Sequence, residues 1–507
     1  MRFVDKDLLS VQEARILMEN AGEARKVLAG FEQERLDRIV VHMAQAAAKH
    51  ARELAVMSCE ETEYGNWQDK YRKNRYICEY LPEKLKTMRF VGIISEDREE
   101  KMMKVGVPLG IIAALTPSTN PVSTTIYQAL IAVKSGNAIV FAPHERAAKT
   151  TGRALDILME AAAEAGLPDG ALSYLGTVTR QGTEALIGHP AVALVIDTGV
   201  PEMTEAAKAA GKPFIYGGTV GSPAFIERTA DIPKAVKAIM ASRNFDYGIV
   251  PAAEQYIVAD SRIAGEAKRE FERNGAYFMS GDEEKQLIGL LCPENGSQDP
   301  ELVGKPAREL ARRAGFSVPD TVKVLVSEQK YISDRNPYAR ALLCPVLVYY
   351  IENDWVHACE KCIELLANES HGHTLVIHSK DEEVIRQFAL KKPVARMLVN
   401  TPAVFGSMGV TTNLFPAMTL GSITAGVGIT SDSVSPMNLI YVRNVGYGVR
   451  EIEDRMAGDA EERNGRADAA VLSTTCQTAV PKGGDDSLDD ELERAMKKLL
   501  EWMAEEE

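Results

Sequence analysis

Cysteine is scarce in this sequence, and its spacing fits no zinc site. Seven cysteines occur among 507 residues, and the one close pair, Cys359 and Cys362, has no second pair to complete four ligands. We therefore expect reduced, buried thiols of the kind that cytosolic proteins carry, and no metal site.

Long hydrophobic runs and an excess of basic residues are also missing. The longest apolar stretch, Val105 to Leu115, contains a proline and is too short to span a bilayer, and no signal peptide opens the chain. The 72 acidic residues outnumber the 58 lysines and arginines, so the protein should repel phosphodiester backbones. We expect a soluble, cytoplasmic protein with no membrane and no nucleic-acid partner, long enough for about three domain-sized units.

What the chain does contain is an alternation of short apolar runs with helical patterns. Residues 10–57 carry apolar positions at helical spacing and predict two amphipathic helices. Beyond residue 107, predicted strands and helices alternate, which is typical of βαβ units in a parallel sheet with helices on both faces. We expect two α/β domains in series. The predicted strands are residues 109–114, 138–141, 172–175, 193–196, 255–258, 322–326, 347–350 and 375–378, and the predicted helices are residues 122–133, 147–165, 203–210, 263–274 and 359–367.

The C-terminal tail differs in kind from the rest. Residues 451–486 are charged and rich in small residues, which predicts a flexible linker. In residues 487–507, Ser487 can cap an amphipathic helix. A helix of this length needs a partner to be stable in water, and that partner is either the chain's own subunit or another protein reached through the linker. The apolar stripe consists of Leu488, Leu492, Ala495, Met496, Leu499 and Met503.

Several motifs follow one another in a fixed order along the chain. They are residues 107–110 (VPLG), 116–121 (TPSTNP), 137–147 (NAIVFAPHERA), 370–374 (SHGHT), 399–402 (VNTP), 418–421 (MTLG) and 431–436 (SDSVSP). Each motif is weak alone, but their order and spacing together are specific. Between Val11 and Arg450 the chain resembles the CoA-acylating aldehyde dehydrogenases, including the aldehyde half of the bifunctional aldehyde-alcohol dehydrogenases. A generic dinucleotide-binding fold would need all these motifs to coincide by chance.

The resemblance implies an α/β aldehyde dehydrogenase fold. It divides the chain into a Rossmann-like nucleotide-binding domain (residues 1–244), a catalytic α/β domain (residues 245–435) and a β-strand oligomerisation extension (residues 436–450). It also implies an oxidoreductase that converts a small aldehyde and coenzyme A to an acyl-CoA while NAD or NADP is reduced. A homodimer or homotetramer is expected on the same ground.

The terminal helix resembles the encapsulation peptides that tether enzymes inside bacterial microcompartments. We therefore expect residues 487–503 to bind a microcompartment shell protein. Such binding would place the protein in the microcompartment lumen.

The family resemblance also assigns roles to single residues. Asn120 follows a predicted strand and would donate its amide to the substrate oxygen, as an oxyanion-hole donor; a turn asparagine before proline is the alternative. For His144 and Arg146, which would contact the nucleotide, a solvated loop is the alternative. The strand-turn-helix junction at residues 197–203 would offer exposed amides to a pyrophosphate. The expected cofactor-binding residues are Thr116, His144, Arg146, Thr198, Gly199 and Gly218.

Proline occupies the position where the family has its nucleophilic cysteine. Residues 245–255 read FDYGIVPAAEQ, and Pro251 fills the cysteine slot. A thiolate is needed there to attack the aldehyde carbonyl and to carry the acyl group to coenzyme A. Proline removes the sulfur and also a backbone N–H that serves the oxyanion. Ala341, in place of a ribose-binding glutamate, and an altered loop at residues 216–223 weaken the expected cofactor contacts as well.

Three interpretations of Pro251 follow. In the first, the chain has lost acylation and serves as a structural or regulatory subunit inside a microcompartment. In the second, another thiol acts as the nucleophile, for which Cys344 is the candidate. In the third, a working enzyme has had its cysteine replaced by engineering or sequence error. Because Ala341 and the loop are altered too, the first is favoured over the third. At family level the sequence predicts a catalytically impaired aldehyde dehydrogenase of the CoA-acylating type.

Overall fold

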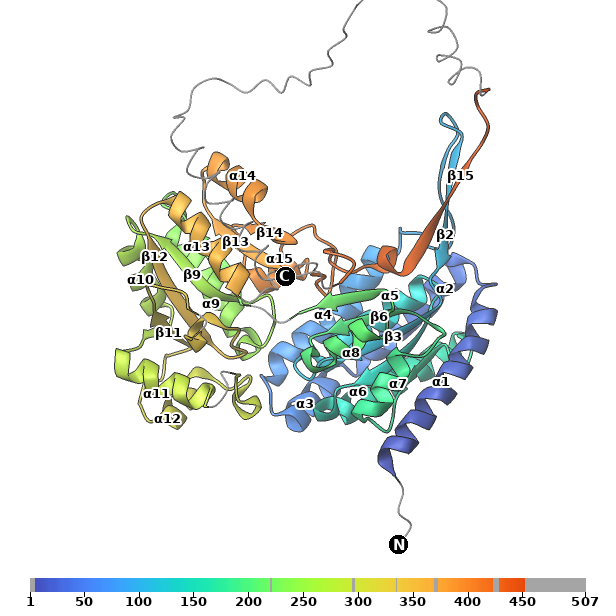
Figure 1. Cartoon of the computed structure of the whole chain (residues 1–507), viewed down its shortest axis with the longest axis horizontal. Coiled ribbons are helices and arrows are strands. Elements are labelled where there is room, and N and C mark those ends of the chain that lie inside the picture. The colour runs from blue at the N-terminus through green and yellow to red at the C-terminus, as the bar shows by residue number, and fades with distance from the viewer. Residues whose placement is uncertain are drawn as a thin grey trace, which may run out of the picture. The chain divides into compact units, whose positions relative to one another are not determined.

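The protein has an α/β fold in which two parallel sheets and one small antiparallel sheet carry the helices (Figure 1). The computed structural model describes residues 5–218, 221–293, 297–333, 335–368, 373–422 and 428–451. Residues up to Tyr447 belong to one compact unit. The predicted linker and terminal helix lie outside the described residues, apart from Glu451.

The first parallel sheet is made of strands whose side chains are almost all buried. All six residues of β3 and of β4 are buried, as expected for strands covered on both faces. The strands run in the order β5-β4-β3-β6-β7, each pair parallel. They span Ile111–Thr116 (β3), Ala138–Pro143 (β4), Leu172–Tyr174 (β5), Val192–Thr198 (β6) and Phe214–Gly217 (β7).

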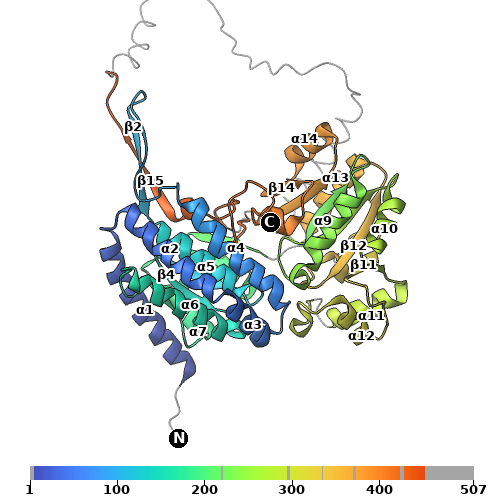
Figure 2. The ribbon, with the colours of Figure 1, turned by 180° about the vertical axis from the view of Figure 1, so that it is seen from behind.

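The central helix of this half, α5, is buried on all sides. Every one of its residues from Pro121 to Lys134 is buried, because it packs between the sheet and helices α2, α4 and α6 (Figure 2). The prediction of two helices over residues 10–57 is wrong: the chain breaks at residues 29–32 and again at His50, which gives three. The helices are α1 Lys6–Leu28, α2 Gln33–Lys49, α3 Ala51–Thr62, α4 Trp67–Leu85, α6 Ala148–Glu164, α7 Arg180–Ile187 and α8 Thr204–Ala209.

The second parallel sheet begins before the predicted domain boundary at residue 244. Strand β8 precedes that residue and helix α9 ends at it, yet β8 pairs with β9 and β13 of the second sheet. The strand order is β10-β11-β12-β9-β8-β13-β14. The strands span Ser222–Ile226 (β8), Glu254–Asp260 (β9), Ala276–Phe278 (β10), Val324–Glu328 (β11), Val346–Glu352 (β12), Thr374–His378 (β13) and Arg396–Val399 (β14); the helices span Ile232–Asn244 (α9), Ala264–Arg273 (α10), Gly281–Leu291 (α11), Ala307–Ala314 (α12), Trp355–Asn368 (α13), Glu382–Lys391 (α14) and Ala403–Ser407 (α15).

An antiparallel ribbon joins the two ends of the compact unit. β1 (Gly92–Asp97) and β2 (Met102–Pro108) form a hairpin, and β15 (Ile440–Gly446) pairs with β2 from the far end of the chain. Most side chains of β1 and β15 are exposed. β15 lies within the predicted extension of residues 436–450; its role in oligomerisation stays a prediction.

None of the helices in the described ranges is long and apolar enough to cross a membrane. The same ranges hold no group of three or more histidine, cysteine or acidic side chains that could bind a metal ion. The described cysteines carry free thiols.

Candidate active site

The site lies where the first sheet changes its direction of winding. The chain builds β3, β4 and β5 outward on one side and then returns to add β6 and β7 on the other. Doubly wound sheets bind their ligands at such a switch, beyond the carboxyl ends of the strands. Here the switch falls between β3, which ends at Thr116, and β6, which ends at Thr198.

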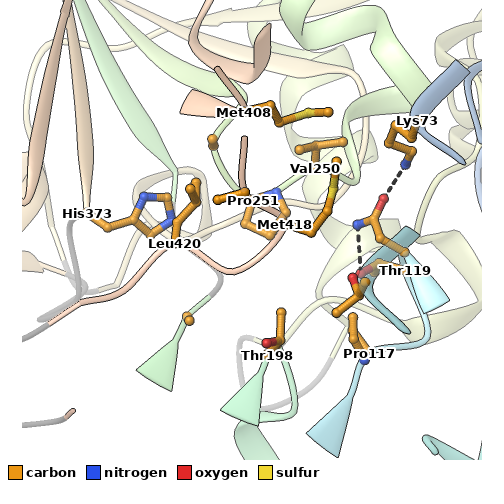
Figure 3. A pocket seen from close by; sticks show the side chains of 17 residues that line it. Lys73, Pro117, Thr119, Thr198, Val250, Pro251, His373, Met408, Met418 and Leu420 are labelled. Atoms are coloured by element: carbon orange, nitrogen blue, oxygen red, sulfur yellow. Dashed lines mark hydrogen bonds between the residues drawn. The ribbon is translucent and has the colours of Figure 1, made fainter. Parts of the chain in front are cut away.

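A small, mostly apolar cavity lies at this switch (Figure 3). Its volume is about 50 Å³, room for a few water-sized groups. Asn120 and Pro251 both line it, as do Thr198, Gly199 and Gly218. The structure thus brings together five of the residues named from the sequence. The same lining also includes Val250, His373, Met408, Met418 and Leu420.

Asn120 offers an amide N–H to the cavity because its oxygen is already held. It stands at the start of α5, and Lys73 donates a hydrogen bond to its Oδ1. A lysine ammonium only donates, so this bond fixes which end of the amide is the oxygen. The amide nitrogen donates to Thr119 Oγ1 at 3.2 Å, which leaves one N–H for a ligand oxygen. This arrangement suits the predicted oxyanion donor.

Lys73 also belongs to a buried ion cluster that sequence reasoning missed. Lys73 and Lys70 both donate to the carboxylate of Asp246, which is fully buried. Burial lowers the pKa of Lys73 to about 8 even though Asp246 opposes this shift. Burial opposes the charge of Asp246, but the two lysines outweigh it and lower its pKa. The partners are more than 170 positions apart in the chain, so no local pattern points to them.

Asp246 starts a left-handed turn that leads into the cavity wall. Asp246, Tyr247 and Gly248 have φ angles of 49°, 52° and 75°, a conformation that costs non-glycine residues energy. The backbone N–H of Asp246 donates to Asp69, and its carboxylate accepts the N–H of Asn66. The ion cluster therefore holds a strained turn, and this turn positions residues 250–252.

Pro251 brings neither a thiol nor an N–H to the wall. Among the described lining residues none is a cysteine. His373 lies elsewhere along the same cavity (Figure 3), and burial together with nearby Arg396 lowers its pKa to about 3. The imidazole is therefore neutral at physiological pH. The sequence motif contained His373, but no role was assigned to it.

Cys344 is poorly placed to act as a substitute nucleophile. It is completely buried and is not among the residues that line the described cavity. Burial raises the pKa of its thiol to about 12, whereas the thiolate is the nucleophilic form. The backbone carbonyl group of Cys344 lies against Gly248, close to the place where a Cβ atom of residue 248 would be. These positions do not favour the recruited-thiol interpretation.

Two of the three expected cofactor contacts outside the cavity, His144 and Arg146, are already paired within the protein. His144 pairs with Glu202, and Arg146 pairs with Glu301 and stacks on Tyr64. Thr116 is buried at the end of β3. These three residues are not part of the described cavity lining. Thr198 lines the cavity, but its hydroxyl lies in a buried network with Gln128 and Thr419.

The expectation of exposed amides at residues 197–203 is wrong. Gly199 donates its N–H to Gly217, and Val200 donates its N–H to the carboxylate of Asp197. Met203 donates to Val200, and Pro201 has no N–H. A hydrogen bond with His144, together with the residue's own backbone N–H, lowers the pKa of Glu202. The carboxyl group of Asp197 therefore accepts an N–H of the turn that a bound pyrophosphate would otherwise accept.

Comparison with known proteins identifies the family. The model of the aldehyde dehydrogenase family matches residues 6–289. The chain belongs to this family. It is 35% identical over 441 residues to the bifunctional aldehyde-alcohol dehydrogenase AdhE of Escherichia coli K12, an alignment that covers 86% of this chain and 49% of AdhE. The chain thus matches about half the length of this curated relative.

Solved structures agree with this assignment and refine it to the CoA-acylating type. A probable aldehyde dehydrogenase of Listeria monocytogenes is 44% identical, with a TM-score of 0.87, over 89% of this chain and all of that one. A propionaldehyde dehydrogenase from a fucose utilisation microcompartment of Clostridium phytofermentans is 26% identical, with a TM-score of 0.77, over 85% of this chain and 96% of that one. The propionaldehyde dehydrogenase of Rhodopseudomonas palustris, 25% identical with a TM-score of 0.77, over 86% of this chain and 97% of that one, holds coenzyme A and an acylated cysteine. The same Rhodopseudomonas palustris enzyme has also been solved with bound propionyl-CoA.

Proposed function

We propose that this chain is a CoA-acylating-type aldehyde dehydrogenase that has lost the acylating step and acts as a structural or regulatory subunit. One observation carries the proposal: Pro251 stands in the cavity wall that Asn120 also lines, and no described lining residue supplies a thiol. The reaction of this type passes through a thioester on the enzyme, so it requires a sulfur at that place.

No other side chain of the cavity replaces the sulfur. The amine of Lys73 is held between Asn120 and Asp246, and nothing on His373 can form a thioester that coenzyme A would then accept. Loss of a nucleophile costs on the order of a million-fold in rate. Loss of one oxyanion donor adds about a hundred- to a thousand-fold. The expected residual turnover is therefore negligible.

The cavity keeps features that suit a small aldehyde. Asn120 has one amide N–H for the carbonyl oxygen, and Val250, Met408 and Met418 give an apolar lining for a short alkyl chain. A retained pocket without chemistry is consistent with a subunit that senses or holds an aldehyde rather than oxidises it.

Placement inside a bacterial microcompartment is part of the same proposal. It rests on the apolar stripe of residues 487–503, which lie outside the described part of the chain, and on kinship with a microcompartment propionaldehyde dehydrogenase. The stripe would bind a shell protein. A homodimer or homotetramer would form through β15, whose Tyr441 and Val442 are exposed.

The test is a direct assay of acylation with acetaldehyde or propionaldehyde, coenzyme A, and NAD or NADP. We expect no NADH, NADPH or acyl-CoA above background, and little recovery in Pro251→Cys, since the cofactor contacts are altered too. Robust product formation by the unmodified chain would overturn the proposal. If Cys344→Ala then abolished that product, the recruited-thiol interpretation would take its place.

A further inference from the structure

A histidine–glutamate contact crosses the edge of the first sheet where a dinucleotide would bind. His144 directly follows β4, and Glu202 follows β6; His144 Nε2 lies 3.2 Å from Glu202 Oε1. β3 lies between these two strands. Two strand spacings, about 10 Å, separate β4 from β6. The two side chains therefore bridge the strands that flank β3, at the switch point that forms the ligand crevice.

Three backbone N–H groups of the turn that carries Glu202 are already bonded within the protein. A pyrophosphate is normally held by several backbone N–H groups at the start of a helix. The N–H groups of Gly199, Val200 and Met203 already bond to protein oxygens. The helix that follows, α8, has only six residues, so its dipole adds little positive potential.

The charges around the crevice also oppose an anion. Asp197 is fully buried beneath the turn, where its carboxyl group accepts the N–H of Val200 and the hydroxyl of Thr204. Glu202 adds a second acidic side chain. The two basic residues nearby, His144 and Arg146, are each paired with a glutamate. A pyrophosphate would therefore meet acidic side chains and no unpaired cation among these residues.

We infer that this crevice is closed to the pyrophosphate of NAD, NADP and coenzyme A, and that the His144–Glu202 pair is what closes it. The residues present do not fit these groups. This inference is independent of Pro251, because it concerns binding and the proline concerns chemistry. The two failures are separable: a chain that bound NADH would still lack the thiol.

The experiment is a titration of the full chain with NADH and with NADPH, followed by nucleotide fluorescence and calorimetry. The unmodified chain should show no saturable binding. Glu202→Ala opens the pair and removes one carboxylate, and we expect it to bind saturably, with a Kd at least about tenfold below the highest nucleotide concentration at which the unmodified chain shows no saturation. Glu205→Ala is the matched control, since it removes one exposed carboxylate from α8 that pairs only with Lys208 among the described residues, and it should gain nothing.

Each other result would overturn the inference. Saturable binding by the unmodified chain equal to that of Glu202→Ala would show that the crevice is open. Equal gains in Glu202→Ala and Glu205→Ala would show a general effect of charge. No gain in Glu202→Ala, with the melting temperature unchanged, would show that the pair is not the barrier.

Discussion

Lys73 joins the two halves of the site through a single ammonium group. It holds the oxygen of Asn120 on one side and the carboxylate of Asp246 on the other. Asn120 begins α5 of the first half, whereas Asp246 leads into the wall of the second. Asn120, the predicted oxyanion donor, and the turn that leads to Pro251, the predicted nucleophile slot, are therefore held together by one buried lysine.

Glu254, three residues beyond Pro251, makes this region sensitive to pH. Its carboxylate accepts the backbone N–H of Ala403, and burial raises its pKa from 4.5 to about 7. Because the folded-state pKa is raised, the stabilising contribution of Glu254 is present below pH 4.5 and is lost as the pH rises through about 7.

Glu254→Gln removes this titration while keeping the shape and an accepting oxygen. The free energy of unfolding of the variant, minus that of the parent chain, should rise by about 3 kcal/mol between pH 4.5 and pH 8. Urea unfolding at a series of pH values measures it. A difference that does not change with pH would contradict the buried-carboxylate account.

At the scale of elements, the left-handed turn of residues 246–248 is the most constrained connection of the site. A Cβ on Gly248 would lie 2.7 Å from the carbonyl oxygen of Cys344, and φ at Gly248 is +75°. The turn needs glycine for both reasons. The ion cluster of Lys70, Lys73 and Asp246 then holds it in place.

Gly248→Ala should lower the free energy of unfolding by about 2 kcal/mol or more, from the left-handed strain and the close contact together. Gly289→Ala is the matched control, because Gly289 lies inside α11 with nothing near its Cβ position. That control should be stabilising by about 0.5–1 kcal/mol. Chemical denaturation measures both; equal effects of the two changes would sink this account of the turn.

Buried strands could be predicted from the sequence, whereas exposed strands that pair with a distant part of the chain could not. β3, β4 and β6 are continuous apolar runs, so the sequence locates them within a few residues. The hairpin of β1 and β2 is mostly exposed or half-buried and shows no regular apolar alternation, and the pairing of β2 with β15 joins segments more than 300 residues apart. No local periodicity encodes that pairing.

The site also contains residues that could be predicted from the sequence and residues that could not. The convergence of Asn120 and Pro251 on one cavity followed from the order of the motifs, and the structure has both in its lining. The cluster around Asp246 depends on burial of charges that sequence alone reads as exposed. The closed turn at residues 199–203 depends on the carboxyl group of Asp197, which accepts the N–H of Val200, and on the carbonyl oxygen of Gly217, which accepts the N–H of Gly199.

At the scale of the whole molecule, the tail and the compact unit are expected to act separately. The compact unit ends at Tyr447, and the predicted helix begins forty residues later in the sequence. Deletion of residues 452–507 should leave the melting temperature of the compact unit almost unchanged and abolish recruitment to a microcompartment shell. Calorimetry and co-purification with shells measure the two effects.

Substitutions in the predicted terminal helix distinguish binding to a shell protein from packing on its own subunit. Leu492→Glu with Leu499→Glu places charges on the apolar stripe, which cannot then be buried against a shell protein. Recruitment should be lost while the melting temperature stays the same. A fall of several degrees would mean that the helix packs on its own subunit, and the targeting hypothesis would be wrong.

The central claim, that this chain cannot form an acyl-enzyme, is tested most directly by intact-protein mass spectrometry after incubation with propionyl-CoA. Transfer of the acyl group from the thioester to the protein needs no nicotinamide, and propionyl-pantetheine, a thioester without a pyrophosphate, is assayed beside propionyl-CoA. Neither a weak nicotinamide site nor a crevice closed to pyrophosphate can then mask the result. We predict no covalent propionyl group on the unmodified chain, because Pro251 has no sulfur to accept it. A propionyl adduct mapped to a cysteine of the described core would contradict this account.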